Sequence, residues 1–172
     1  MIAWLNGTFG AGKTTTAREL TQLIPQSRIF DSEQIGYMLR HVLTEPVDDF
    51  QDWPPWRPLV TRTAVEILNY VGGTLIIPQT VLVERYAREI FQGFDSEGIS
   101  VQHFVLHASA DELVTRIEGD QIDTMAREWR LKHIARYQEA LPWLRDAATI
   151  VDTSGLPSQK VAQDIASQLR QP

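Results

Sequence analysis

Cysteine is absent from this chain of 172 residues. Without thiols the protein can form neither disulfides nor thiolate metal sites, which fits a reducing cytosol. No stretch approaches the ~20 consecutive apolar residues that a transmembrane helix needs. The N-terminus has neither a basic leader nor a cleavage site. We therefore expect a soluble, unprocessed, cytoplasmic protein with no integral membrane segment.

Positive charge is also scarce, because 16 lysines and arginines face 22 aspartates and glutamates, for a net charge of -6. The resulting pI is near 5.2. This balance argues against binding to nucleic acid or to an anionic membrane surface. We expect small-molecule partners and no nucleic acid, and an anionic ligand would require basic side chains gathered at one place. Composition gives no indication of the oligomeric state.

Five short apolar runs alternate with longer segments of helical periodicity, which is typical of a parallel α/β sheet. The apolar runs cover residues 2–5, 28–30, 74–77, 101–106 and 149–151. The helical patterns cover residues 13–24, 33–43, 58–70, 109–117, 124–141 and 158–169. The length suits one hydrophobic core. We predict a single α/β domain over residues 1–172.

The segment from Gly7 to Thr14 reads Gly-Thr-Phe-Gly-Ala-Gly-Lys-Thr, which matches the P-loop pattern G-x-x-x-x-G-K-[ST]. It lies between an apolar run and a helical pattern, as the motif requires. Glycines allow successive N–H groups to converge on phosphate, and Lys13 can reach the β and γ phosphates. Thr14 is the expected Mg²⁺ ligand. The predicted nucleotide-binding residues are Gly7, Phe9, Gly10, Ala11, Gly12, Lys13, Thr14 and Thr15.

A P-loop alone does not separate kinases from other NTPases. The carboxylates that follow the second apolar run help to decide between these classes of protein. The third run ends in Gln79 and Thr80 rather than in a carboxylate, so Asp31 is the leading metal-side carboxylate. Asp31 could also accept a proton from a hydroxyl, while Glu33 could hold a polar group of the acceptor. The alternative is that Asp31 caps the following helix. Gln79 and Thr80 are candidates for substrate binding or else turn residues.

Three arginines flank a short polar stretch at residues 118–123. Arg116 precedes it, and Arg127 and Arg130 follow at i, i+3 on one helical face. Arginines that arrive on closure would stabilise the charge of a transferring phosphoryl group. We predict a lid at about residues 117–130. The predicted catalytic residues are Lys13, Asp31, Arg127 and Arg130. The alternative is a solvated basic face paired with neighbouring carboxylates.

An acceptor-binding region is predicted at about residues 33–70. Arg40, Trp53, Trp56 and Arg57 combine aromatic faces with positive charge there, which suits a polar ring system. The alternative for the tryptophans is the hydrophobic core.

Several stretches occur together in one order: residues 1–14, Phe30-Asp31 with Gly36 and Leu39-Arg40, residues 48–57, residues 76–80 and residues 103–108. In these stretches the chain resembles the tunicamycin-resistance ATP-binding proteins, within the wider group of small-molecule and nucleoside monophosphate kinases. The resemblance implies a P-loop NTPase three-layer sandwich, with a five-stranded parallel sheet of order 2-3-1-4-5 and a kinase-like lid.

The resemblance also implies ATP and Mg²⁺ as cofactors and a nucleoside-like acceptor, with tunicamycin suspected. It places Arg116 near adenine, and Gly155 and Pro157 against the base. We expect Mg²⁺-dependent phosphotransfer from ATP to a hydroxyl of the acceptor. Two alternatives stay open: binding and sequestration of tunicamycin without catalysis, and a housekeeping nucleotide or metabolite kinase.

Overall fold

The computed structural model describes residues 1–120 and 126–169. Within these residues one sheet contains all five strands, in the order β2-β3-β1-β4-β5, and every neighbouring pair is parallel. The strands are β1 (Ile2–Asn6), β2 (Ser27–Ile29), β3 (Thr74–Pro78), β4 (Val101–His107) and β5 (Thr149–Asp152). The predicted strand order is confirmed.

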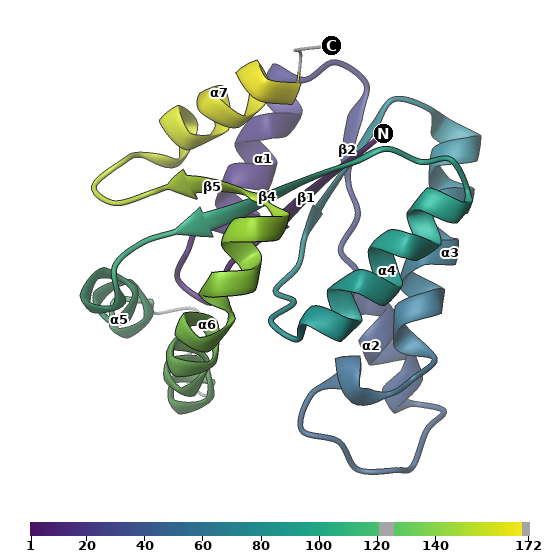
Figure 1. Cartoon of the computed structure of the whole chain (residues 1–172), viewed down its shortest axis with the longest axis horizontal. Helices are drawn as coiled ribbons and strands as arrows, with labels where there is room; N and C mark the ends of the chain where they lie inside the picture. The colour runs from purple at the N-terminus through teal and green to yellow at the C-terminus, as the bar shows by residue number, and fades with distance from the viewer. Residues whose placement is uncertain (121–125, 170–172) are drawn as a thin grey trace.

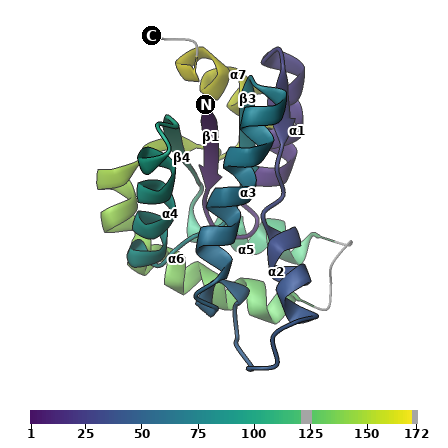
Figure 2. The same cartoon turned by 90° about the vertical axis from the view of Figure 1, so that its right-hand side faces the viewer.

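Helices cover both faces of this sheet (Figures 1 and 2), which makes the fold the predicted three-layer sandwich. One face carries the packed pair α3 and α4, and the other carries α1 and α7. The helices are α1 (Lys13–Leu23), α2 (Glu33–Arg40), the short 3-10 helix η1 (Phe50–Asp52), α3 (Trp56–Val71), α4 (Glu84–Ser96), α5 (Ala110–Glu118), α6 (Arg127–Ala147) and α7 (Ser158–Leu169).

Several elements differ from the sequence-based expectation; helix α2, for one, ends at residue 40 and not at 43. Helix α4 was not predicted, although Tyr86, Ala87, Ile90 and Phe94 bury one face of it at helical spacing. The second strand begins at residue 27 and ends at 29, one residue earlier than expected. Helix α6 continues past the predicted end at residue 141 to residue 147, and Pro142 lies inside it.

The central strand β1 fixes the position of the P-loop. Ala3 and Leu5 enter the core beneath α1 and α7, while Ile2 and Trp4 enter the core beneath α3 and α4. All four side chains are fully buried, which explains why this strand is a continuous apolar run. The loop that follows β1 therefore starts from the most constrained part of the sheet.

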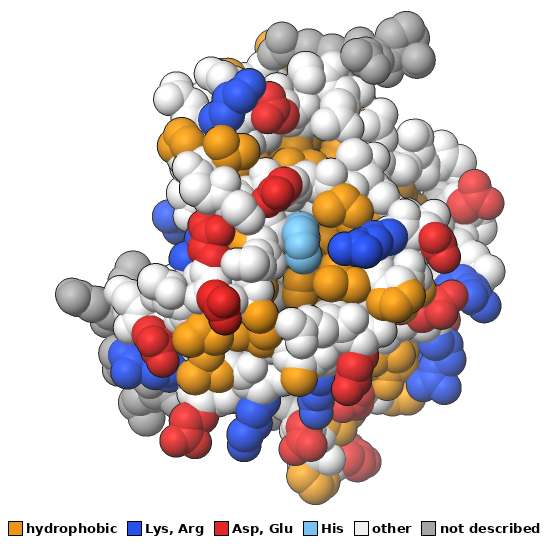
Figure 3. Space-filling view, turned by 60° about the vertical axis from the view of Figure 1, so that its left-hand side comes forward, with side chains coloured by type: hydrophobic (Ala, Val, Ile, Leu, Met, Phe, Trp, Pro, Cys, Tyr) orange, Lys and Arg blue, Asp and Glu red, His pale blue; other side chains and the backbone are white. Residues whose placement is uncertain are grey.

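The surface mixes charges of both signs. On the face drawn in Figure 3, acidic and basic side chains are interspersed with small apolar areas instead of forming one basic stripe. Across the described ranges, no helix combines the length and the apolar character needed to cross a membrane.

Candidate nucleotide and acceptor site

The loop after β1 is a cradle of backbone N–H groups. Gly7, Gly10 and Gly12 have φ angles of 127°, 78° and 90°, which side chains with a Cβ rarely adopt. A Cβ on Gly7 would lie 2.5 Å from the carbonyl oxygen of Leu106, so space as well as conformation requires glycine there. The N–H groups of Gly10 and Gly12 find no acceptor in the described chain. Such free donors at a helix N-terminus suit a phosphate group.

Lys13 opens α1 and lies at the centre of this cradle. Its Nζ donates to the carbonyl oxygen of Thr8 at 2.8 Å and lies 5.4 Å from the centre of the Phe9 ring. Burial lowers the pKa of Lys13 to about 8, while the carboxylate of Glu33 opposes the shift and Arg130 adds to it. The ammonium is therefore poorly compensated before an anion binds, as expected of a phosphate-binding cation.

Asn6, at the end of β1, ties the cradle to the loop after β3. Its Oδ1 accepts from the N–H groups of Gly7 and Val81, at 2.8 and 2.9 Å, and its Nδ2 donates to the carbonyl oxygen of Val81 at 2.8 Å. Thr80 adds a bond from Oγ1 to the carbonyl oxygen of Gly7 at 2.8 Å. Sequence analysis missed Asn6, although a polar residue ending an otherwise apolar strand is a visible signal.

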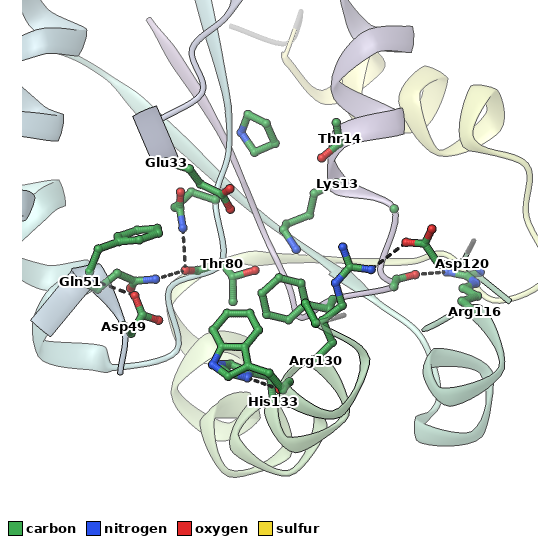
Figure 4. Close-up of a pocket in the computed structure, with 18 of the residues that line it drawn as sticks. Lys13, Thr14, Glu33, Asp49, Gln51, Thr80, Arg116, Asp120, Arg130 and His133 are labelled. Carbon is green, nitrogen blue, oxygen red and sulfur yellow. Dashed lines mark hydrogen bonds and ion pairs between the residues drawn. The ribbon is translucent and has the colours of Figure 1, made fainter. Parts of the chain in front are cut away.

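A cavity of about 730 Å³ opens over the cradle. Figure 4 shows Thr14, Lys13, Arg116 and Asp120 at one end, and Glu33, Asp49 and Gln51 at the other. We call the first the phosphate end and the second the acidic end. The predicted site residues that line the cavity are Phe9, Gly10, Gly12, Lys13, Thr14, Thr15, Glu33, Arg40, Gln79, Thr80, Arg116 and Arg130.

Asp31 and Glu33 differ in placement. Asp31 is exposed outside the cavity lining, and its two carboxylate oxygens accept from the N–H of Glu33 and from Nε2 of Gln34, each at 3.0 Å. The N-cap of α2 is Ser32, so Asp31 lies one residue before the cap and bonds the first turn of the helix with its side chain, which is close to the helix-capping alternative. Glu33 does line the cavity, and its carboxylate makes no hydrogen bond with the described residues. Burial raises the pKa of Glu33, with Asp31 adding to the shift and Lys13 opposing it.

The expected aromatic acceptor pocket is not formed. Trp56 is 0% exposed and Trp53 7%, and both belong to the core with α3 and α4. Arg57 is also buried, where it pairs with Glu89 and donates to the carbonyl oxygen of Gln51 at 2.5 Å. These three side chains lie in the protein interior, beneath the connection between α2 and α3, and do not face the cavity. Of the predicted group, Arg40 alone lines it.

Arg116 joins the P-loop to the loop after β5. It donates to the carbonyl oxygens of Gly10 at 3.3 Å and Thr153 at 2.7 Å, and pairs with Glu112 at 2.5 Å. Glu112 in turn accepts from the N–H of Gly155 at 3.1 Å. Gly155 and Pro157 do not line the cavity, so their expected contact with the base finds no support in this geometry.

The remaining arginines lie at the start of α6. Arg130 lines the cavity and pairs with Asp120 at 2.7 Å, which joins the two sides of the expected lid. Arg127 lies outside the cavity lining, and its Nη2 is 3.5 Å from the carbonyl oxygen of Glu118. Residues 121–125 of the expected lid lie outside the described residues, so the lid stays a prediction.

Helix α6 also contributes an aromatic cluster that sequence analysis missed. The ring centres of Trp129 and His133 lie 4.1 Å apart, and those of Phe9 and Trp129 lie 4.8 Å apart. Both α6 side chains line the cavity. Their i, i+4 spacing was a signal of a shared helix face, but nothing local indicated that this face meets the P-loop.

The groups that line the cavity supply some of the ligands that ATP and Mg²⁺ need. The glycine cradle and Lys13 fit a polyphosphate, and the hydroxyl of Thr14 is a ligand of the oxygen type that Mg²⁺ takes together with phosphate and water. In the described ranges no group of three or more histidines and carboxylates is arranged to hold a metal by itself. A metal here would thus depend on the nucleotide for most of its ligands.

The sheet order and the P-loop cavity together define a protein of the P-loop small-molecule kinase fold. No family model and no curated protein matches the chain. Among solved structures it is similar to the tunicamycin resistance protein of Deinococcus radiodurans, with 30% identity over 98% of this chain and 94% of that chain and a TM-score of 0.74. The chain therefore belongs to the family of that protein.

Two further structures share the fold. One is a sugar kinase from Janibacter sp. HTCC2649, with 19% identity over 98% of this chain and 93% of that chain and a TM-score of 0.69. The other is a gluconokinase from Sinorhizobium meliloti 1021, with 14% identity over 97% and 91% and a TM-score of 0.66. At these identities the likeness concerns the fold alone.

Proposed function

We propose that this protein transfers the γ phosphoryl group of ATP to a hydroxyl of a nucleoside-like small molecule. The observation that carries the proposal is the cavity that joins the P-loop cradle to an end lined by Glu33, whose carboxylate makes no hydrogen bond with the described residues. Tunicamycin is the first acceptor to test, because the related D. radiodurans protein is named for resistance to it.

The residues divide between the two ends of the cavity. The N–H groups of the cradle, Lys13 and Arg130 would hold the phosphates and the charge that spreads over the transferring group. Thr14 would hold Mg²⁺, which supplies neutralisation of phosphate charge when bound. Arg116, fixed by Thr153 and Glu112, would border the adenine.

Glu33 replaces Asp31 as the residue that would receive the proton, because it lines the cavity while Asp31 lies outside it and bonds the first turn of α2. In the step, the acceptor oxygen forms a bond to the γ phosphorus as the bond from that phosphorus to the bridging oxygen breaks. The hydroxyl proton passes to Glu33, and ADP leaves. A raised pKa suits a base that must hold this proton.

Mass spectrometry of tunicamycin after incubation with ATP, Mg²⁺ and the protein tests the proposal. We expect the mass to rise by one phosphoryl group and an equal amount of ADP to form. Lys13→Met should abolish both. Lys160→Met should change neither, because the Lys160 side chain is exposed on α7, where it pairs with Asp164. Tight binding of tunicamycin without phosphorylation of it or of any other hydroxyl compound would refute transfer and favour sequestration.

A further inference from the structure

The acidic end of the cavity is built by three separate elements. Glu33 comes from α2, Asp49 from the connection that precedes η1, and His133 from α6. Figure 4 shows Glu33 and Asp49 set apart from Arg116 and Asp120, with Thr80 between the two groups. Residues 33, 49 and 133 are distant in sequence, so their convergence is a property of the fold.

Two carboxylates at this end have free oxygens. Among the described residues the carboxylate of Glu33 makes no hydrogen bond, and that of Asp49 makes one, in which Oδ1 accepts from the N–H of Gln51 at 2.9 Å. Burial raises the pKa of both groups. Asp49 adds to the shift of Glu33, which places the two carboxylates within electrostatic reach of each other.

His133 supplies an independent indication of a ligand. It is 5% exposed, and its Nδ1 lies 2.7 Å from the carbonyl oxygen of Trp129, so Nδ1 carries the proton in the neutral ring. The other nitrogen, Nε2, has no hydrogen-bond partner in the described chain, although the residue lines the cavity. An acceptor nitrogen that belongs to a cavity-lining side chain and has no partner there is open to a hydrogen-bond donor of a ligand.

The charge at this end is negative. Asp48 also lines the cavity, as does Arg40, which is exposed and lies over the Tyr37 ring at 5.6 Å. Lys13 and Arg130 offset part of the negative charge of Glu33, but both belong to the phosphate end, where a bound nucleotide would occupy them. The other lining arginines, Arg116 and Arg130, already pair with carboxylates at the phosphate end. A second anion at the acidic end would meet repulsion in a partly desolvated space.

Resting on the proposed function, we infer that the acidic end selects an uncharged, hydroxyl-rich ring as acceptor and rejects anionic acceptors such as phosphate esters and sugar acids. Ring hydroxyls donate to the free oxygens of Glu33 and Asp49, and one of them meets Nε2 of His133. Trp129, which is 40% exposed, offers an aromatic face beside His133. Hydroxyl donors satisfy carboxylate acceptors without adding charge.

Calorimetric binding to protein saturated with a non-hydrolysable ATP analogue tests the inference, because the analogue keeps the P-loop from capturing a probe phosphate. The probes form two pairs of rings that differ by an anionic group: uridine with uridine 5′-monophosphate, and glucose with glucuronate. We expect the uncharged member of each pair to bind about tenfold tighter or more. Equal affinities, tighter binding of the anionic members, or no binding of either uncharged ring would overturn the inference.

Variants assign the selectivity to its residues. Asp49→Asn keeps an oxygen for the N–H of Gln51 and removes the charge, so the preference should fall several-fold. His133→Phe should weaken the uncharged probes and leave the ATP analogue bound. Asp164→Asn removes a carboxylate on the solvent side of α7 and should leave the preference unchanged. If Asp49→Asn also leaves it unchanged, the assignment fails.

These measurements require no chemistry, so they separate this inference from the proposed function. A protein that prefers uncharged rings but phosphorylates none would refute phosphotransfer and keep the acidic end as a selective site. A protein that phosphorylates an anionic acceptor efficiently would refute the selectivity of the acidic end and keep phosphotransfer.

Discussion

The carboxamide of Asn6 lies against the imidazole of His103, with 3.3 Å between Asn6 Nδ2 and His103 Nε2. Nδ1 of His103 lies 3.3 Å from the carbonyl oxygen of Ala147, and burial lowers the pKa of His103 to about 4, so a neutral ring accepts through Nε2. This contact fixes which way the Asn6 amide points. Its Oδ1 is thereby presented to the N–H of Gly7.

Asn6→Asp should therefore damage the P-loop more than its small change of shape suggests. The variant loses the donor to Val81 and His103 and places a charge at a fully buried site. We expect a loss of about 2 kcal/mol or more in unfolding free energy and weaker ATP binding. Urea denaturation and calorimetry measure both. Asn69→Asp, on the exposed side of α3, is the control, and equal losses in the two variants would contradict the role of Asn6.

Gly7 and Gly98 separate backbone strain from crowding. Both have positive φ, but a Cβ at Gly7 would lie 2.5 Å from the Leu106 carbonyl oxygen, whereas nothing lies within 4 Å at Gly98. Gly98→Ala should cost about 1 kcal/mol from conformation alone. Gly7→Ala should cost clearly more and also weaken binding of an ATP analogue. Chemical denaturation compares them, and similar costs would mean that β4 yields to the added methyl group.

Binding of phosphate should depend on the protonation of Lys13. Because burial lowers its pKa to about 8, the free protein loses the ammonium charge as pH rises through that value, and binding must then take up a proton. Affinity for an ATP analogue should fall above about pH 8, by at most tenfold per pH unit. Lys13→Arg keeps its charge and should show a flatter profile between pH 7.5 and 9.5. An identical slope in this variant would assign the dependence to another group.

The carboxylates of the acidic end should reduce stability at neutral pH. Burial raises the pKa of Glu33 and Asp49 above the ordinary values of 4.5 and 3.8, so the native state loses stability as pH rises from those values past the raised ones. Glu33→Gln and Asp49→Asn should raise Tm at pH 7, and the gain should disappear below about pH 4. Thermal unfolding at several pH values checks this. A gain that persists in acid would indicate better packing as its cause.

The sequence was sufficient to predict the features whose signal lies in a short stretch of residues. The P-loop has a fixed spacing, and a strand and a helix flank it as the motif requires. The sheet order came from family resemblance, and the parallel strands from alternation of apolar runs with helical patterns.

The residues that line the cavity beyond the P-loop were less predictable. Asp31 and Glu33 are both acidic and two residues apart, and the exact start of α2 decides which of them bonds the first turn of the helix and which lines the cavity. Trp56 and Arg57 have the chemistry of a ligand platform, yet packing places them inside. Asp49 and His133 are 84 positions apart in the chain and line the same cavity, which no local pattern predicts.

Gly36, within α2, should control the acidic end through its contact with Phe50. A Cβ on Gly36 would lie 2.5 Å from the Phe50 ring, which packs against Trp56 with ring centres 5.2 Å apart and therefore has little room to retreat. Gly36→Ala should push η1 away from α2 and increase the spacing between Glu33 and Asp49. We expect weaker acceptor binding with unchanged binding of the ATP analogue.

Gly93→Ala is the matched control, because its Cβ would lie 2.8 Å from Thr61 at the contact between α3 and α4, outside the cavity lining. Both substitutions crowd a helix contact, offset in part by the higher helix propensity of alanine, about 1 kcal/mol. Both variants should therefore lose stability in urea, while Gly36→Ala alone loses affinity for the uncharged probe. Equal loss of that affinity in Gly93→Ala would show that general loosening, and not the spacing of the two carboxylates, governs the acidic end.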